Sequence, residues 1–151
     1  MFLKIPTTAP LYRLFRLVQD VYYYCKFLPK YFHNANVRRG FRGEQAAVRH
    51  LRKSKYRILE RNWSFGIYEV DIIAEKNDCL IFVEVRGRNE TSLQSGFDSV
   101  DRRKKQALQM VIKHYLRTHR SYLSYRLDII SITWTNTGKI RSLNHYETVR
   151  L

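Results

Sequence analysis

Three carboxylates lie inside two short apolar segments of the chain, where a charged side chain is costly to bury. Glu69 and Asp71 lie in the segment YEVDIIA, and Glu84 lies in CLIFVEVRGR. Side chains two residues apart share one face of a strand, so Glu69 would lie beside Asp71, and Glu84 beside Arg86. A hard cation bound by carboxylate oxygens would compensate these charges. An internal ion pair of Glu84 with an arginine, or exposure on an open face, would do so too.

Glu44 adds a carboxylate from a predicted helix. It shares a helical stripe with Ala47, Val48 and Leu51, at spacings of three and four residues, so we expect it to point toward the sheet. An acid in the first helical turn can also be there because it interacts favourably with the helix dipole. Inward carboxylates on successive elements nevertheless favour a common site for Glu44, Asp71 and Glu84.

The elements that must carry these residues form a regular series. A helix is predicted from residue 40 to just before residue 56, followed by strands over 56–62, 67–74 and 79–86. The turns SFG and EKND between the strands are short, which predicts an antiparallel meander. A second helix over 99–116 and strands over 126–134 and 139–146 complete an α/β fold with a mixed sheet and the order α-β-β-β-α-β-β.

The first 36 residues form a separate, basic and aromatic extension ahead of a domain over 37–151. The segment LYRLFRLVQDVYYYCKFL has apolar residues at helical spacing, which predicts an amphipathic helix. Such a helix could pack on the domain, pack on a second copy of the chain, or contact a membrane surface. Residues 1–19 contain basic residues but no acid, which also weakly resembles an organellar transit segment.

The charge of the chain points to an anionic partner. Lys and Arg total 28 against 13 Asp and Glu, which gives a formal net charge of +15 on 151 residues. Nucleic acid is the commonest partner for so basic a protein, and an anionic membrane surface is second. With 44% hydrophobic residues, the chain is long enough for one domain with its own core and too short for a second.

Several other classes are excluded by what the sequence lacks. Cys25 and Cys79 lie far apart without metal-ligand spacing, so neither a disulfide framework nor a zinc site is indicated, and a reducing cytoplasm is expected. Charged residues interrupt the apolar N-terminal stretch, which predicts neither a transmembrane helix nor a signal peptide. The five histidines are scattered, and there is no Gly-rich phosphate loop.

Five segments in order carry a family resemblance: RGEQAAVRHL, RNWSFGIYEVDIIA, LIFVEVRGR, SVDRRKK and YRLDIISI. Over residues 40–146 the chain resembles the YraN-like family of predicted endonucleases, which are similar to archaeal Holliday-junction resolvases within the restriction-endonuclease-like fold. The family's G-E pair falls on Gly43 and Glu44, and its G-E-I-D on Tyr68, Glu69, Val70 and Asp71. Its E-V-K falls on Glu84, Val85 and Arg86, its helical K on Lys104, and its R-F-D on Arg126, Leu127 and Asp128.

The resemblance implies a metal-dependent endonuclease or resolvase-like phosphodiesterase that acts on DNA. Mg²⁺ (or Mn²⁺) would be held by Asp71, Glu84 and the carbonyl of Val85, while Glu44 would bind a second ion or orient water. The polar loop 87–97 would contact the substrate strand. Phosphate contacts are expected from four basic residues, Arg88, Arg102, Arg103 and Lys105, which could equally be ordinary solvated charges. A homodimer is compatible with resolvase-like cleavage of two strands.

Two departures from the family pattern affect these expectations. Tyr68 replaces a glycine at a strand position. Arg86 replaces the signature lysine, and because arginine stays protonated it can clamp phosphate but is poorly suited to activating water. Lys104 or Gln106 could supply that role from the helix, so Glu44, Asp71, Glu84, Arg86 and Lys104 are the catalytic candidates. The alternatives are a catalytically impaired nucleic-acid-binding protein and a membrane-associated adaptor.

Overall fold

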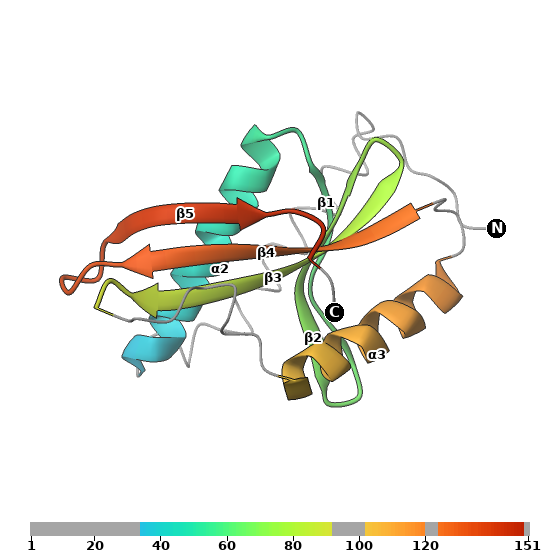
Figure 1. Ribbon diagram of the computed structural model, residues 1–151, viewed down its shortest axis with the longest axis horizontal. Coiled ribbons are helices and arrows are strands. Elements are labelled where there is room, and N and C mark those ends of the chain that lie inside the picture. The colour runs from blue at the N-terminus through green and yellow to red at the C-terminus, as the bar shows by residue number, and fades with distance from the viewer. Residues whose placement is uncertain (1–33, 92–101, 120–123, 150–151) are drawn as a thin grey trace. The chain divides into compact units, whose positions relative to one another are not determined.

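The computed structural model describes residues 34–91, 102–119 and 124–149 (Figure 1). In chain order the elements are α2 (Ala35–Lys53), β1 (Arg57–Phe65), β2 (Tyr68–Lys76), β3 (Cys79–Asn89), α3 (Arg102–Thr118), β4 (Ser124–Trp134) and β5 (Ile140–Tyr146). This is the predicted order, and it confirms an α/β fold. The amphipathic helix predicted within residues 1–36 lies outside the described residues.

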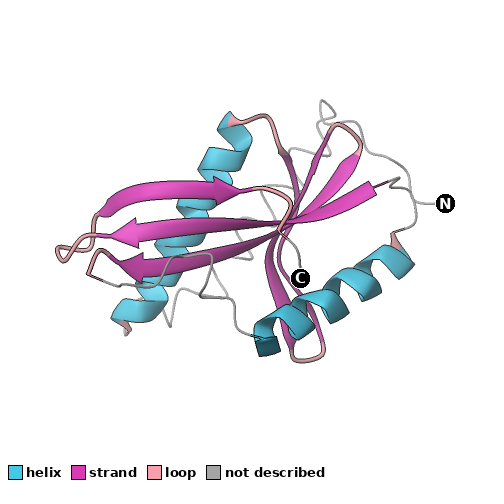
Figure 2. Ribbon diagram, in the orientation of Figure 1, coloured by secondary structure: helices cyan, strands magenta, loops and turns pink. Residues whose placement is uncertain are grey.

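The five strands form one mixed sheet in the order β1-β2-β3-β4-β5 (Figure 2). β1, β2 and β3 pair antiparallel, which confirms the predicted meander. β4 then runs parallel to β3 over the full length of both strands, from Cys79 opposite Ser124 to Asn89 opposite Trp134. β5 returns antiparallel to β4. The segment that contains α3 connects β3 to β4, because two parallel neighbouring strands need a crossover connection.

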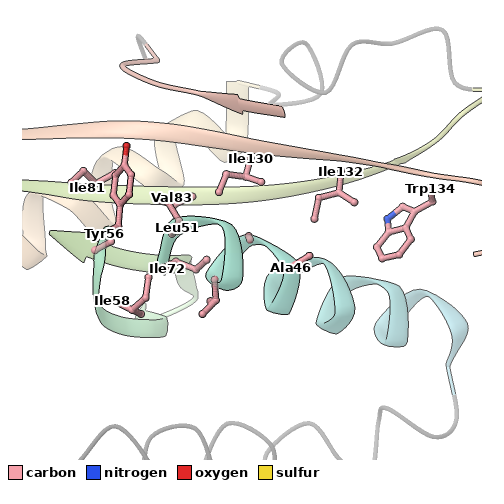
Figure 3. Close-up of a cluster of buried hydrophobic side chains, with 13 residues drawn as sticks. Ala46, Leu51, Tyr56, Ile58, Ile72, Ile81, Val83, Ile130, Ile132 and Trp134 are labelled. Carbon is pink, nitrogen blue, oxygen red and sulfur yellow. The ribbon is translucent and has the colours of Figure 1, made fainter. Parts of the chain in front are cut away.

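Two hydrophobic clusters cover the two faces of the sheet. Ile81 and Val83 of β3 pack with Ala47, Val48 and Leu51 of α2, together with Ile130, Ile132 and Trp134 of β4 (Figure 3). The alternate β3 residues, Leu80 and Phe82, pack with Leu108, Val111 and Tyr115 of α3. Alternation along β3 therefore assigns each side chain to one helix, and it places Glu84 on the face that α3 covers.

Helix α2 begins earlier than the sequence pattern predicted. The side chain of Asn34 caps it, since Asn34 Oδ1 accepts hydrogen bonds from the backbone N–H of Asn36 at 2.8 Å and of Val37 at 3.4 Å. The helix therefore starts at Ala35 and its first turn contains no acid. The prediction that Glu44 lies in the first helical turn is wrong, and an interaction with the helix dipole does not explain this residue.

The remaining bounds differ from the predictions by a few residues. β3 extends to Asn89 because β4 pairs with it that far, so the first residues of the predicted loop 87–97 belong to a strand. Residues 92–97 lie outside the described residues, as does the predicted start of α3 at residue 99. Internal contacts group Arg42–Leu151 into one compact unit and Met1–Phe41 into another. The predicted division after residue 36 stays a prediction.

Neither helix in the described part of the chain combines the length and apolar character needed to span a membrane. Both carry many charged residues: α2 reads ANVRRGFRGEQAAVRHLRK and α3 reads RRKKQALQMVIKHYLRT. Each buries one apolar stripe against the sheet and exposes the charged residues on its other face, the pattern of a helix on a sheet in a globular domain.

Candidate active site

Asp71 lies where the pairing of β2 with β3 stops. Ile72 opposite Val83 is the last register pair at this end, and Asp71 comes next on β2. Its Oδ2 accepts a hydrogen bond of 2.6 Å from the backbone N–H of Val85. The carboxylate thus takes a position that a backbone carbonyl of β2 would hold if the ladder continued. Because the N–H and C=O of one strand residue point to the same edge, the Val85 carbonyl also faces β2.

Glu84 is the buried acid of the neighbouring strand, with only 3% of its side chain exposed. Two cations face it: Nζ of Lys104 lies 3.0 Å from Oε2, and Nε of Arg86 lies 3.3 Å from Oε1. Lys104 comes from the first turn of α3, and its ammonium also donates a hydrogen bond of 3.4 Å to the backbone carbonyl of Glu69. The internal ion pair considered for Glu84 is therefore present, and it includes a lysine from the helix as well as the arginine.

The surroundings of Asp71 and Glu84 disfavour the ionised form of both carboxyl groups. The pKa of Glu84 is raised to about 7: burial, and then repulsion from Asp71, raise it, and attraction to Lys104 and Arg86 only partly opposes them. Burial also raises the pKa of Asp71, an effect opposed first by the Val85 N–H and then by Lys104. Oε2 of Glu84 lacks a hydrogen bond of normal geometry despite the nearby ammonium. The two cations match the two carboxylates in number, but they do not fully offset the burial and the mutual repulsion of the acids.

Gly43 lets α2 approach the sheet next to this cluster. A Cβ at this position would lie 3.3 Å from Cδ1 of Ile132 and 3.9 Å from Cγ1 of Val85, so a larger side chain would push the helix outward. The next residue, Glu44, is partly buried and accepts a hydrogen bond of 3.3 Å from Nδ2 of Asn62. Asn62 lies between register pairs Arg61–Ile72 and Trp63–Val70, which places it opposite Asp71.

Glu44 therefore lies on the α2 side of Asp71 and contacts a residue that sequence reasoning did not single out. Asn62 has a positive φ of 50°, a conformation that asparagine tolerates better than most residues and that the Asn-Trp-Ser sequence alone does not reveal. Among the described residues no group of three or more His, Cys, Asp and Glu side chains converges as a metal site. Glu44, Asp71 and Glu84 therefore do not form such a group of three.

The donors available to a cation are therefore two carboxylates and one carbonyl. Oxygen ligands of this type suit Mg²⁺ or Mn²⁺ and do not suit soft metals. The mutual repulsion of the buried Asp71 and Glu84 and the poorly satisfied Oε2 of Glu84 are the features that a bound divalent cation would relieve. Asp71, Glu84 and the Val85 carbonyl thus fit such an ion.

The predicted phosphate contacts occupy different positions. Arg88 is partly buried on β3, where its Nε donates a hydrogen bond of 3.2 Å to Oγ1 of Thr133. Arg103 is exposed on α3 and Lys105 is partly exposed. The side chain of Arg102 lies outside the described part of the chain. Gln106 is exposed on the helix, so of the two residues expected to replace the signature lysine, it is Lys104 that contacts Glu84.

A second charged cluster surrounds Asp128, the acid matched to the family's R-F-D. Asp128 is fully buried and pairs in register with Val83, on the α2 face of the sheet. Its carboxylate accepts hydrogen bonds from Nε of Arg126 at 3.0 Å and from the backbone N–H of Thr148 at 3.0 Å, and it lies 2.9 Å from Nε2 of His145. This cluster lies on the opposite face from Glu84.

The site consists of two adjacent buried acids on a mixed sheet and a lysine from a helix that covers this sheet. A family model described as "Uncharacterised protein family UPF0102" matches residues 43–132, and the chain belongs to this family. The resemblance to YraN-like proteins is thereby confirmed. The match contains every residue of the Asp71–Glu84 cluster.

Relatives of the family cover most of the chain. A UPF0102 protein of Porphyromonas gingivalis is 36% identical over 109 residues, which is 72% of this chain and 81% of the relative. A UPF0102 protein of Pelotomaculum thermopropionicum is 35% identical over 109 residues, 72% of this chain and 91% of the relative. A UPF0102 protein of Dictyoglomus thermophilum is 37% identical over 99 residues, which is 65% of this chain and 84% of the relative.

Proposed function

We propose that this chain is a metal-dependent endonuclease or resolvase-like phosphodiesterase of the cytoplasm that acts on DNA, with a restriction-endonuclease-like fold. The observation that carries the proposal is the position of Lys104. Its Nζ lies 3.0 Å from Glu84, on the acid that neighbours Asp71. Lys104, which matches the family's helical lysine, would thus present an ammonium from α3 at the carboxylate beside which the β3 signature lacks one.

We infer the metal ligands from the donor set. Asp71, Glu84 and the Val85 carbonyl would hold Mg²⁺ or Mn²⁺. Glu44, which accepts a hydrogen bond from Asn62, would bind a second ion or orient the attacking water. When bound, the cation would stabilise negative charge on the phosphate and lower the pKa of water. Such an ion is held more weakly while Glu84 is protonated, because a protonated carboxyl is a poorer ligand.

The two cations beside Glu84 would have different tasks. Lys104 presents a compact ammonium, anchored by Glu84 and by the Glu69 carbonyl, which can donate to a phosphate oxygen as negative charge develops on it. Arg86 is 31% exposed and presents a planar fork suited to binding phosphate oxygens in the ground state. In the reaction a water oxygen would bond to phosphorus and lose a proton to solvent, while one P–O bond of the backbone breaks and the leaving oxygen takes up a proton from solvent to become a hydroxyl.

The charge of the chain supports a nucleic-acid substrate. A formal net charge of +15 favours binding to a polyanion, and α3 contributes Arg, Lys and His residues without any acid. Binding to duplex DNA should therefore weaken steeply with salt, with a slope of about −0.9 in log affinity for each phosphate neutralised. A flat salt response would remove this support.

Catalysis is tested on a panel of branched, flapped, single-stranded and duplex DNA and RNA with Mg²⁺ and with Mn²⁺. We expect metal-dependent cleavage that is lost in Asp71→Asn and in Glu84→Gln, while DNA binding measured by anisotropy in EDTA is retained. Glu75→Gln is the matched control, because Glu75 is a half-buried acid of the same strand β2 that forms its ion pair with Arg57, away from this cluster. This control should cleave like the wild type.

The alternative is a nucleic-acid-binding protein without catalysis, which Arg86 in place of lysine favours. Wild-type protein that binds DNA with a steep salt dependence, but cleaves no member of the panel with either metal, would establish that alternative. Normal cleavage by Asp71→Asn would show that the active site is wrongly placed.

A further inference from the structure

The tip of the β1–β2 hairpin exposes apolar side chains next to α3 (Figure 1). Phe65 is 38% exposed and Ile67 is 91% exposed, on either side of Gly66 in the turn. Met110, on the outer face of α3, is 47% exposed. Tyr125, Ile140 and Tyr146 of β4 and β5 are exposed as well. Phe65 and Ile67 differ from them in lying together at one hairpin tip, as apolar surface that the fold itself does not use.

The exposed ring of Phe65 is held in a fixed orientation. It stacks on the imidazole of His114 from α3, with ring centroids 3.6 Å apart and an interplanar angle of 14°. Trp63 supports the imidazole at 5.9 Å and contacts Tyr115 edge-on at 5.1 Å. The pair is therefore a supported, flat aromatic surface, and its flat outer face suits a further ring.

The surface beside this aromatic pair is basic. The exposed stripe of α3 that contains Met110 also contains Arg103, Lys113 and Arg117, and α3 has no acidic residue. Two copies of this stripe would repel each other, which disfavours a second copy of the chain as the occupant. A polyanion with flat apolar rings is complementary to it in both charge and shape.

We propose that Phe65, stacked on His114, is a platform for an unpaired nucleobase, so that the substrates of this protein contain a single-stranded segment. The inference rests on the proposed function for its nucleic-acid partner. Lys104 and His114 are ten residues apart on α3, which corresponds to about 15 Å along the helix. At about 3.4 Å per nucleotide in one strand, the stacked base would lie about four nucleotides from the phosphodiester held at Lys104.

The test measures binding of the full chain in EDTA to blunt duplex DNA and to the same duplex with a single-stranded tail. Phe65→Ala should lower affinity for the tailed DNA about 5- to 150-fold, because one base–aromatic stack contributes about 1–3 kcal/mol, and should leave the blunt duplex unaffected. A 2-aminopurine base in the tail should lose fluorescence on binding the wild type and keep it with the variant. Phe65→Trp should restore both readouts.

Tyr125→Ala is the matched control, because Tyr125 is an exposed aromatic residue of β4 (55% exposed) outside the hairpin. It should behave as the wild type. Equal loss on blunt and tailed DNA, or absence of fluorescence change with the wild type, would overturn the platform. So would a change from dimer to monomer in Phe65→Ala with DNA binding intact, since the tip would then be an interface between copies. Because binding is measured without metal, failure of cleavage alone would reject the nuclease and leave the platform standing.

Discussion

The sheet carries one buried acidic cluster on each face, and the two are built in opposite ways. On the α2 face, Asp128 has a guanidinium, an imidazole and a backbone N–H around one carboxylate. On the α3 face, Asp71 and Glu84 adjoin each other, and burial with mutual repulsion raises the pKa of Glu84 to about 7. The Asp128 carboxylate is fully hydrogen-bonded, whereas Asp71 and Glu84 repel each other and Oε2 of Glu84 lacks a hydrogen bond of normal geometry.

We propose that this difference separates a structural acid from a functional one. Groups with strongly perturbed pKa values and incomplete hydrogen bonding concentrate at functional sites, whereas fully satisfied buried charges hold a fold in register. The Asp128 cluster joins three parts of the chain: Arg126 also donates a hydrogen bond of 2.8 Å to the hydroxyl of Tyr56 and lies 3.0 Å from Glu147. We therefore expect substitutions there to affect folding, and substitutions at the other cluster to affect chemistry.

The largest effect on stability is expected at Asp128. Asp128→Asn would leave Arg126 without its buried counter-charge, and loss of one partner of a buried pair costs about 3–5 kcal/mol. Urea unfolding at neutral pH measures this change. Asp78→Asn, an exposed turn residue with φ 57° that asparagine also adopts, is the control and should unfold like the wild type. Unchanged stability in Asp128→Asn would break the comparison.

Lys104→Ala should have the largest effect on rate after loss of the metal ligands themselves. Removal of one donor to developing charge lowers the rate about 100- to 1000-fold. Single-turnover cleavage at saturating protein measures it, with Lys105→Ala as the neighbouring control on the same helix. A Lys104→Ala variant that cleaves normally would reassign the lysine to structure, like Arg126 on the other face.

Glu84→Gln should make the metal-free protein more stable at pH 8. The folded state binds the Glu84 proton more tightly than the unfolded state, whose pKa is near 4.5, so ionisation costs stability as pH rises from about 4.5 to about 7. Glutamine mimics the neutral acid, and we expect a gain of about 3 kcal/mol at pH 8 that vanishes below pH 4.5. Thermal unfolding in EDTA at both pH values checks it; a loss of stability at pH 8 contradicts it.

Arg86→Lys should have the smallest effect. With Lys104 already against Glu84, a second lysine adds no new function and loses the planar phosphate fork, so the cleavage rate should stay equal or fall by less than about tenfold. A large increase in rate would show instead that Arg86 limits catalysis and that Lys104 serves another role. The same cleavage assay distinguishes these outcomes, with binding in EDTA as the control for folding.

Much of the fold follows from local patterns in the sequence. Alternation along β2 and β3 predicted the strands, and it placed Glu84 on one face of β3 with Arg86, whose Nε lies 3.3 Å from its carboxylate. The start of α2 was missed because its signal is a single capping residue, Asn34, whereas Gly40 suggested a boundary that the helix crosses. The contact of Glu44 with Asn62 depends on the register of β1 against β2 and on a left-handed residue, neither of which a single sequence encodes locally.

The parallel join between β3 and β4 has a consequence for the order in which the chain folds. β1, β2 and β3 are connected by short turns, as are β4 and β5, so each group can form from local contacts within microseconds to milliseconds. Pairing of β3 with β4 requires the chain to bring together the two ends of the long connection that contains α3. Until then, the apolar edge of β3, with Ile81 and Val83, is open to pairing with other chains. The docking of α3 thus sets both the folding rate and the time during which the protein can aggregate.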